Sequence, residues 1–474
     1  MKRKEFLGYI AKSAGFVFVS TNFPAAKYLI GSGKEVKGEV TSNGKGIKDV
    51  IVSDGYTVIQ TDKKGRFEIE PNAASKAIFI STPAGYEFIN KNGITRHYTL
   101  VKDLDAEKRI SFELQPLGKD DNEHQFIIWA DPQVKNDKDV QKMMDYSVPD
   151  TRKLIAAAGT GTLLHGITVG DIVWDNHALY ADYDRAVGKM DIPFFQCLGN
   201  HDMDLNQGGD ENSDITFHQN YGPTYYSFNR GQAHYVVMDN VRYLGKDKEY
   251  DGFVQQNQLD WLQKDLSFVP KDKLIILCLH IPVYSGTKNK EDLYKLLDGR
   301  NVHIMSGHTH YHQNNIRENI FEHNHGTVCG AWWTGEICCD GTPNGYGVYK
   351  VTGKELSWHY QSTGESADHQ MKIFVSNYND TQKQVVANIW NYDPAWKNEY
   401  WIDDVSHGSL EQFEGYDPQA YKNLLGPDLP KARGFAEPNI TDHLFKALIP
   451  ATAKTVKVVA TDRFGKVYSS SYKI

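Results

Sequence analysis

Residues that could bind metal ions follow the apolar segments in the middle of the chain. Their side chains are carboxylates, carboxamides and imidazoles, and in chain order they are Asp131, Gln133, Asp171, Asp175, Asn200, His201, Asp202, His280, His308 and His310. A protein core favours apolar residues at such positions, because a buried charge is costly unless it is paired or bound to a metal. Oxygen and imidazole ligands without thiolates suit Mn, Fe or Zn at an open catalytic site. These residues therefore predict a metal-dependent catalytic site.

The elements that must position these residues alternate along the chain. Apolar runs typical of buried strands lie at 126–130, 166–169, 194–198, 274–279 and 302–305. Amphipathic segments typical of helices lie between them, at 140–157, 179–190 and 255–266. Such alternation predicts an α/β domain with helices on both faces of its sheet. Because ligands of open α/β sheets gather at the carboxyl ends of the strands, we expect the metal-binding residues to meet at one edge.

The segments on either side of this α/β region have the pattern of β-domains. Between 35 and 118, short alternating runs are separated by turn residues, which predicts a β-sandwich. Part of it, from Gly38 to Ile69, resembles the transthyretin-type module of carboxypeptidase regulatory domains. We place the central domain at 122–362 and expect 366–474, where helices are scarce and short strands recur, to form a C-terminal β-domain.

Composition limits the class of protein. The chain has 474 residues, of which 40% are hydrophobic and 24% charged, as expected for a globular protein of more than one domain. Its net charge of −8 argues against a nucleic-acid partner, because phosphate backbones require a basic surface. A small phosphorylated substrate remains compatible with this charge, because bound metal cations can supply a positive field locally. No apolar run approaches the roughly 20 residues of a spanning helix.

The first residues have the order of an export signal. Lys2-Arg3-Lys4 is followed by a mixed apolar stretch and then by Pro24-Ala25-Ala26. This start resembles a twin-arginine leader in which Lys replaces the second Arg. We therefore predict a leader over 1–34 and a periplasmic or extracellular protein. An amphipathic N-terminal helix on a cytoplasmic protein is the alternative.

The metal-binding residues also occur in recognisable motifs. These are Asp131, Gly170-Asp171-x-x-Asp175, Gly199-Asn200-His201-Asp202, His280 and Gly307-His308-x-His310. In type, order and spacing they resemble the calcineurin-like metallophosphoesterases, and the resemblance covers roughly residues 125–353. It implies a central four-layer αββα domain flanked by β-sandwich-like domains at both ends, as in some bacterial members of the family.

The resemblance also implies roles for the residues. One metal ion would be held by Asp131, Asp171 and His310, with Gln133 near it. Asp171 would bridge to a second ion held by Asn200, His280 and His308. His201 would stabilise the phosphoryl group or protonate the leaving oxygen, with Asp202 and Asp175 orienting it and the neighbouring ligands. The implied reaction is hydrolysis of a phosphomonoester or phosphodiester by a hydroxide that two metal ions activate.

Two features leave alternatives open. Gln133 stands where the family usually has His, and its neutral oxygen donor favours a harder ion such as Mn or Mg, or a degenerate site. Trp332 and Trp333 follow the last ligand motif and could offer aromatic faces to a substrate or pack against the C-terminal domain. The rival functions are cleavage of a phosphoanhydride, as in a nucleotide or nucleotide-sugar, and glycan or surface binding by a protein that has lost catalysis.

Overall fold

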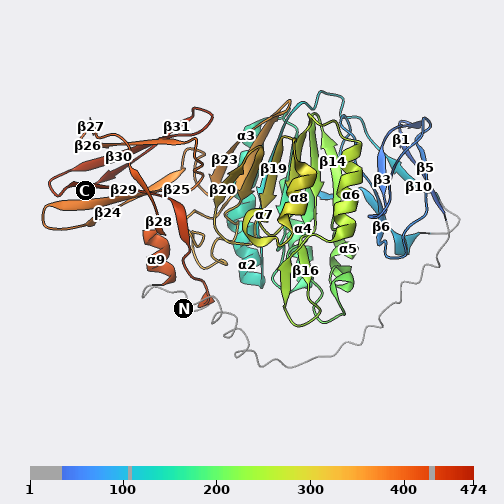
Figure 1. Cartoon of the computed structure of the whole chain (residues 1–474), viewed down its shortest axis with the longest axis horizontal. Helices are drawn as coiled ribbons and strands as arrows, with labels where there is room; N and C mark the ends of the chain where they lie inside the picture. The colour runs from blue at the N-terminus through green and yellow to red at the C-terminus, as the bar shows by residue number, and fades with distance from the viewer. Residues whose placement is uncertain (1–34, 105–108, 426–432) are drawn as a thin grey trace.

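A computed structural model describes residues 35–104, 109–425 and 433–474 of the chain. The predicted leader at 1–34 lies outside these residues. The molecule is elongated, with an α/β region between two β regions (Figure 1). No helix in the described part of the chain combines the length and the apolar character that a membrane span requires.

The N-terminal β-domain consists of two four-stranded sheets around one core. The first sheet contains β1 (Val36–Ser42), β2 (Lys45–Gly46), β5 (Arg66–Ile69) and β10 (Ile110–Glu113). The second contains β3 (Ile51–Ser53), β4 (Val58–Gln60), β6 (Ala77–Ile80) and β9 (Tyr98–Leu100), which is followed by a 3-10 turn at Val101–Asp103. Buried and exposed residues alternate along β5 and β10, so one face of the sheet packs inward and the other meets solvent.

The central domain contains two further sheets, which we name after a strand in each. The β12 sheet has the order β23 (Glu355–Ser362), β22 (Gly345–Thr352), β11 (Glu123–Trp129), β12 (Leu164–Val169), β13 (Phe194–Cys197), β8 (Ile94–Thr95) and β7 (Asn90–Lys91). The β18 sheet has the order β14 (Tyr226–Arg230), β15 (Ala233–Val237), β18 (Leu274–Cys278), β19 (Val302–Ser306), β21 (Ile320–Asn324) and β20 (Gln313–Arg317).

Helices cover the outer faces of these two sheets. The β12 sheet is covered by α2 (Asp137–Lys142), α3 (Val148–Ala158) and α4 (Tyr180–Met190), and the β18 sheet by α6 (Gln256–Ser267) and α8 (Lys290–Leu297). Shorter elements at the strand ends are 3-10 turns at His177–Leu179 and Asp210–Asn212, α5 (Ile215–Tyr221), α7 (Val283–Gly286) and a hairpin of β16 (Val241–Tyr243) and β17 (Tyr250–Gly252). The predicted four-layer αββα arrangement is confirmed by the two cores, one between the sheets and one beneath the helices of the β12 sheet.

Residues of one strand pack on opposite sides of the β12 sheet. Phe126 and Ile128 of β11 join the core between the two sheets, whereas Ile127 and Trp129 join the core beneath the helices. This alternation follows from the period of two in a strand, and it explains why strands covered on both faces are continuously apolar. Between the sheets, Phe195 stacks on Phe228 with ring centroids 3.7 Å apart.

The first predicted helix contains a π-helical turn. The residues predicted as helix at 140–157 are all helical, but α2 ends at Lys142, a π-helical turn covers Met143–Ser147, and α3 starts at Val148. Pro149 lies in the first turn of α3, where its missing N–H and its ring are tolerated. Upstream of it the hydrogen-bond pattern shifts, which produces the π-helical turn.

The C-terminal β-domain also consists of two four-stranded sheets around one core. The first has the order β24 (Met371–Asn377), β25 (Gln382–Ile389), β29 (Ile440–Pro450) and β28 (Glu411–Tyr416). The second has the order β27 (Val405–Ser406), β26 (Lys397–Ile402), β30 (Thr455–Thr461) and β31 (Val467–Lys473). Helix α9 (Pro418–Leu424) follows β28 and is capped by the Asp417 side chain.

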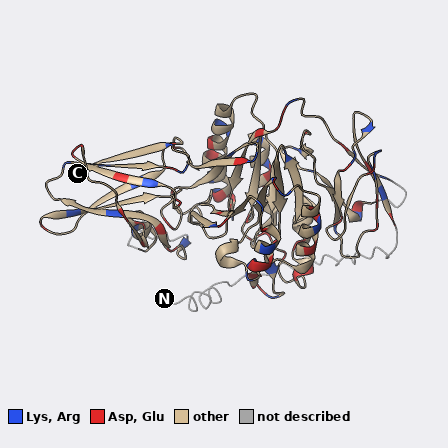
Figure 2. Cartoon of the chain, turned by 45° about the horizontal axis from the view of Figure 1, so that its top comes forward, with Lys and Arg blue, Asp and Glu red and all other residues tan. Residues whose placement is uncertain are grey.

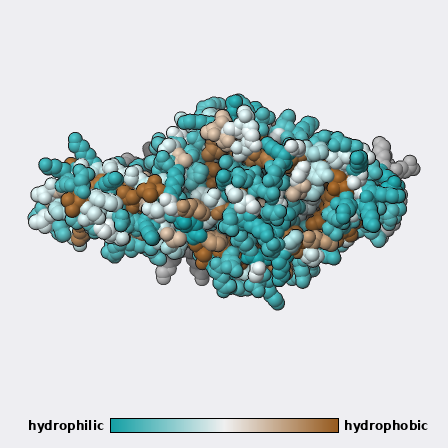
Figure 3. Space-filling model, turned by 90° about the horizontal axis from the view of Figure 1, so that it is seen from above, coloured by the Kyte–Doolittle hydropathy of each residue, from teal (hydrophilic) through white to brown (hydrophobic). Residues whose placement is uncertain are grey.

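Acidic, basic and apolar residues are mixed on the surface of the molecule. Figure 2 shows acidic and basic residues interspersed over the helices of the central domain. The face seen in Figure 3 is mostly hydrophilic, and its hydrophobic residues form separate small patches.

Candidate metal centre

The predicted ligands follow strand ends in an uncommon backbone conformation. Asp131 (φ 48°) follows β11, Asp171 (φ 49°) follows β12, and His308 (φ 72°) follows β19. Gln133 and His310 also have positive φ, at 42° and 56°. Such left-handed residues cost of order 1–3 kcal/mol each and cluster at functional sites, where the surrounding structure enforces them. They turn the chain so that side chains from separate strands meet at one edge.

Glycines beside the ligands allow these loops to approach one another. A Cβ added to Gly199 would lie 2.0 Å from the Asp171 nitrogen and 2.3 Å from its Oδ1. A Cβ added to Gly307 would lie 2.3 Å from Oδ2 of Asp131. Both distances are far shorter than a van der Waals contact, so only glycine fits at these two positions.

Asp171 lies at the centre of the site and is 1% exposed. Its Oδ1 accepts a hydrogen bond from the backbone N–H of His201 at 2.9 Å, and its Oδ2 accepts one from Nε2 of Gln133 at 3.0 Å. Nε2 of His280 is 3.3 Å from Oδ1. Asp171, His280 and His308 offer ligand atoms that all lie within 4.8 Å of one another.

The hydrogen bonds of His280 show which of its nitrogens faces the site. Nδ1 lies 2.9 Å from the carbonyl oxygen of Val169, which can only accept, so Nδ1 carries the hydrogen. The Nε2 lone pair then faces the Oδ1 atoms of Asn200 at 3.0 Å and Asp171 at 3.3 Å, with Nδ1 of His308 at 3.1 Å. A proton on Nε2 can link these acceptors when no metal is bound, and a metal ion can take the place of that proton. The donor set therefore fits a metal ion.

His310 is oriented like His280, with one ring nitrogen bound to a backbone carbonyl group and the other facing a carboxylate, that of Asp131. Nδ1 of His310 donates to the carbonyl oxygen of Gly330 at 2.7 Å, which leaves Nε2 facing Oδ1 of Asp131 at 3.6 Å. A histidine held by its outer nitrogen in this way presents a fixed lone pair to a metal. The Asp131 carboxylate also accepts the backbone N–H of His308 at 2.9 Å.

Burial shifts the pKa values of these groups in the directions that favour neutral forms. It raises the pKa of Asp131 to about 8, and it lowers the pKa of His310 to about 4 and that of His308 to about 3. Burial opposes charge on Asp171 and His280 as well, but their mutual attraction outweighs it. The pKa of Asp171 is therefore lowered and that of His280 is raised to about 9. Without metal, a proton on His280 compensates the carboxylate, and a bound cation would take its place.

His201 lies beside this cluster, and a carboxylate holds its ring. Its Nδ1 is 2.8 Å from Oδ1 of Asp175, whose other oxygen is paired with Lys248. Burial lowers the pKa of His201, but the Asp171 and Asp175 carboxylates outweigh this effect and raise it. These carboxylates favour the protonated form of the imidazole, which is the form that a general acid needs.

Asp202 has different partners from those expected. Its buried carboxylate accepts backbone N–H groups of Ile172 at 3.1 Å, Val173 at 3.2 Å and Gly199 at 2.9 Å. It therefore ties together the two loops that carry Asp171 and His201. Asp175 is the residue that holds the His201 ring, so a direct catalytic role for Asp202 stays a prediction.

The two predicted tryptophans occupy different environments. The Trp332 ring stacks on His310, with centroids 4.2 Å apart and an interplanar angle of 19°. Trp333 is buried in the core beneath the helices, and its Nε1 donates to the carbonyl oxygen of Pro132 at 3.0 Å. Trp332 thus borders the candidate site, whereas Trp333 supports the loop that carries Asp131 and Gln133.

Several neighbours of the site were not predicted. Trp174 lies against His201, with ring centroids 5.2 Å apart, although it is part of the motif between Asp171 and Asp175. Arg433 and Phe435 reach the site from the C-terminal β-domain. No motif marked these two residues, because their role depends on how the domains pack and not on local sequence.

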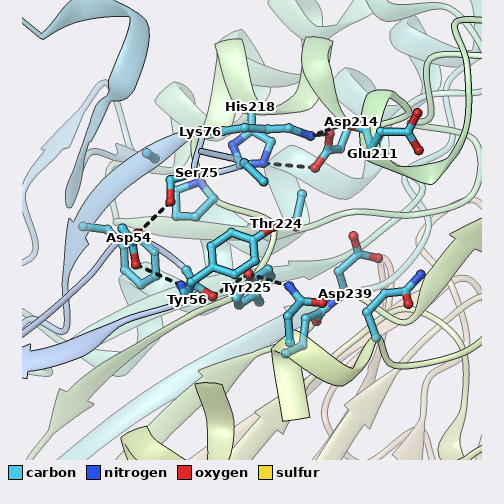
Figure 4. Close-up of a pocket in the computed structure, with 18 of the residues that line it drawn as sticks. Asp54, Tyr56, Ser75, Lys76, Glu211, Asp214, His218, Thr224, Tyr225 and Asp239 are labelled. Carbon is cyan, nitrogen blue, oxygen red and sulfur yellow. Dashed lines mark hydrogen bonds and ion pairs between the residues drawn. The ribbon is translucent and has the colours of Figure 1, made fainter. Parts of the chain in front are cut away.

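A cavity of about 290 Å³ lies at the junction of the N-terminal β-domain and the central domain (Figure 4). None of the predicted metal ligands lines it. Its charged side chains interact with one another, with Asp214 paired to Lys76 and 3.1 Å from Nε2 of His218. Asp54 accepts a hydrogen bond from the Ser75 hydroxyl at 2.7 Å. The cavity is therefore separate from the candidate metal centre.

Three segments of the chain match models of known protein families. Residues 124–312 match the calcineurin-like phosphoesterase family, residues 34–117 match the N-terminal domain of calcineurin-like phosphoesterases, and residues 322–468 match their C-terminal domain. The chain belongs to the calcineurin-like phosphoesterase family and is a phosphoesterase hydrolase. Members of this family depend on a dinuclear metal centre.

Solved structures were also matched, each at low identity. A dimetal phosphatase from Danio rerio is 14% identical, with a TM-score of 0.36, over 50% of this chain and 96% of its own. A purple acid phosphatase from yellow lupin is 13% identical, with a TM-score of 0.38, over 51% of each chain. An NAD nucleotidase from Haemophilus influenzae is 11% identical, with a TM-score of 0.29, over 51% of this chain and 49% of its own. No curated protein matched the chain.

Proposed function

We propose that this phosphoesterase hydrolyses a phosphomonoester or phosphodiester at a centre of two metal ions. Asp131, His310 and the shared Asp171 would hold one ion, with Gln133 beside it. The second ion would be held by Asp171, Asn200, His280 and His308. When bound, the ions would polarise a phosphoryl oxygen and activate a water molecule.

The single observation that carries this proposal is the convergence of acceptor atoms around His280. Its Nε2 lone pair, fixed by the Val169 carbonyl group, faces the oxygens of Asn200 and Asp171 at 3.0 and 3.3 Å. The Asp131 and Asp171 carboxyl groups have histidine nitrogens as neighbours, at 3.6 Å and 3.3 Å. Buried carboxylates and imidazole lone pairs in this arrangement are compensated by metal ions in catalytic sites.

The remaining catalytic and positioning roles belong to side chains that do not bind the ions. His201 protonates the leaving oxygen, because Asp175 holds its Nδ1 and its backbone N–H donates to Asp171, which keeps the residue beside the metal ligands. Asp175 keeps the imidazole oriented, and Lys248 balances the charge of Asp175. Asp202 holds the loops of Asp171 and His201 in register through backbone amides. Gln133 orients Asp171 through its Nε2 hydrogen bond.

The test is an activity assay on chelator-treated protein that is reloaded with single metals. We expect hydrolysis of p-nitrophenyl phosphate, its bis-ester, or both after addition of Mn, Fe, Zn or Mg, and negligible hydrolysis without metal. Absence of turnover with every metal, on both esters, would contradict the proposal. The ratio of the two rates would show whether monoesters or diesters are preferred.

We also propose that the protein is exported. The support is the order of basic, apolar and small residues within 1–34, which lies outside the described residues. The full chain should appear in the periplasm or medium of its host with a shortened N-terminus, as measured by N-terminal sequencing. Full-length protein found only in the cytoplasm would contradict export.

A further inference from the structure

Three aromatic rings from distant parts of the sequence meet at the edge of the candidate metal centre. They are Trp174 from the loop after β12, Trp332 from the loop after β21, and Phe435 from the segment before β29. The Phe435 ring centroid is 5.3 Å from that of Trp174 and 5.3 Å from that of Trp332. Both contacts are edge-to-face, at 77° and 75°, a favourable geometry for aromatic pairs.

Each end of this aromatic cluster touches a residue of the candidate metal centre. Trp174 lies against His201, the proposed donor of the proton to the leaving group, at a centroid distance of 5.2 Å. Trp332 stacks on His310 at 4.2 Å. The three rings therefore form a wall that extends from the leaving-group side of the site to a metal ligand. A leaving group that receives a proton from His201 would lie against this wall.

The C-terminal β-domain holds the wall in place. Nε of Arg433 donates to the carbonyl oxygen of Trp332 at 2.9 Å, and its guanidinium group is paired with Asp139 at the start of α2. The guanidinium carbon is also 5.5 Å from the Trp174 ring centroid. Arg433 is only 9% exposed, so this link between the domains is a buried one.

The wall combines exposed apolar surface with positive charge. Phe435 is 36% exposed, although it lies beside a polar catalytic site. Nζ of Lys135 is 4.5 Å from the Trp174 ring centroid, which places a cation at the wall in addition to Arg433, whose charge Asp139 compensates. The exposed Phe435 ring offers a surface on which a planar group of a phosphate ester can stack, and Lys135 places a positive charge near it that can attract the anion of the ester.

We propose that Trp174, Trp332 and Phe435 form a subsite for a planar, ring-bearing leaving group of the phosphorylated substrate. This inference rests on the proposed function, because it places the ring on the His201 side of the reacting phosphoryl group. The C-terminal β-domain thereby contributes to substrate selection through Phe435. Arg433 acts as a positioning residue, because it fixes Trp332 and Trp174.

The test compares two monoesters that share the same leaving oxygen. Adenosine 5′-monophosphate and ribose 5-phosphate both release a primary alcohol, but only the first carries a planar base. We expect kcat/KM of the metal-loaded enzyme to be at least about tenfold higher for the first ester, because base–aromatic stacking contributes about that factor. Phe435→Ala should lower kcat/KM for adenosine 5′-monophosphate by about tenfold, mainly by raising KM. The same substitution should change kcat/KM for ribose 5-phosphate by less than about twofold. Phe435→Trp should restore the preference.

Phe464→Ala is the matched control. Phe464 is also an exposed ring of the C-terminal β-domain, at 46% exposure, with an edge-to-face contact to a tryptophan, Trp358, at 4.8 Å. Its removal should cost similar stability but leave the ratio between the two esters unchanged. A wild-type ratio near one, or an unchanged ratio in Phe435→Ala, would overturn the subsite.

The two proposals can fail separately. If no ester is hydrolysed with any metal, the proposed function fails. Calorimetric measurement of the binding of the same two esters to the metal-loaded protein then tests whether the aromatic subsite exists. Tighter binding of adenosine 5′-monophosphate that is lost in Phe435→Ala supports the wall. Equal binding of both esters overturns it.

Discussion

Replacing His201 by alanine isolates the step that we assign to this residue. The ring is held by Asp175 at 2.8 Å, whereas only the backbone N–H of residue 201 contacts Asp171, at 2.9 Å. Alanine removes the ring and keeps the backbone bond. The substitution should therefore remove the proton donor while the metal ligands keep their positions.

The size of the effect follows from this role. Loss of a positioned general acid lowers the rate by about 10²–10⁴-fold, which corresponds to roughly 3–5 kcal/mol in the activation free energy. The loss should be greater for phenyl phosphate than for p-nitrophenyl phosphate, because the more basic phenoxide depends more on protonation as it leaves. Metal content should stay equal to that of the wild type.

The assay measures kcat for both esters in parallel with the metal content of each preparation. His218→Ala is the control, because His218 is 13% exposed and lies 3.1 Å from Asp214, a setting close to that of His201 beside Asp175. It should leave kcat and metal content unchanged. Loss of metal from His201→Ala, or equal losses on the two esters, would refute the role of His201 as the acid.

Three further predictions concern the metal loops, acid stability and metal removal. Gly199→Ala should abolish metal binding and activity together, since its Cβ would lie 2.0 Å from the Asp171 nitrogen; elemental analysis showing normal metal content would contradict this. Burial lowers the pKa of His97 to about 3 from 6.5, so the folded chain binds fewer protons than the unfolded chain below pH 6.5. His97 should therefore reduce the free energy of unfolding by about 1.4 kcal/mol per pH unit as the pH falls from about 6.5 towards 3. His97→Phe should make the denaturant-derived stability less dependent on pH by that amount, and an unchanged slope would show that His97 is protonated when folded. Chelation should lower the melting temperature by several degrees, because metal ions bind the folded chain preferentially; an identical melting temperature with and without metal would count against a loaded centre.

The central strands and the residues at their ends were predictable from the sequence. The end of β11, from Phe126 to Trp129, and all of β18 are buried on both faces, so each reads as an apolar run that a ligand residue soon follows. The polar residues after these runs stand out because parallel strands end at one edge. This is why Asp131, Asp171 and His280 could be grouped before their distances were known.

Features that depend on packing between domains were not predictable. The hairpin of β7 and β8 extends the β12 sheet through a single paired residue, Ile94 opposite Phe194, and so short a strand has no sequence signature. Phe435 reaches Trp332 only because the C-terminal β-domain packs beside α2. The choice between Asp175 and Asp202 as the partner of His201 likewise depends on loop geometry and not on spacing.

Metal stoichiometry tests the central claim most directly. After chelation and reloading with Mn, Fe or Zn, elemental analysis should find close to two ions per wild-type chain. Asp171→Asn should retain at most one ion, because Asp171 is the ligand that both ions would share. Fewer than one ion per wild-type chain, or two ions in Asp171→Asn, would contradict the dinuclear centre.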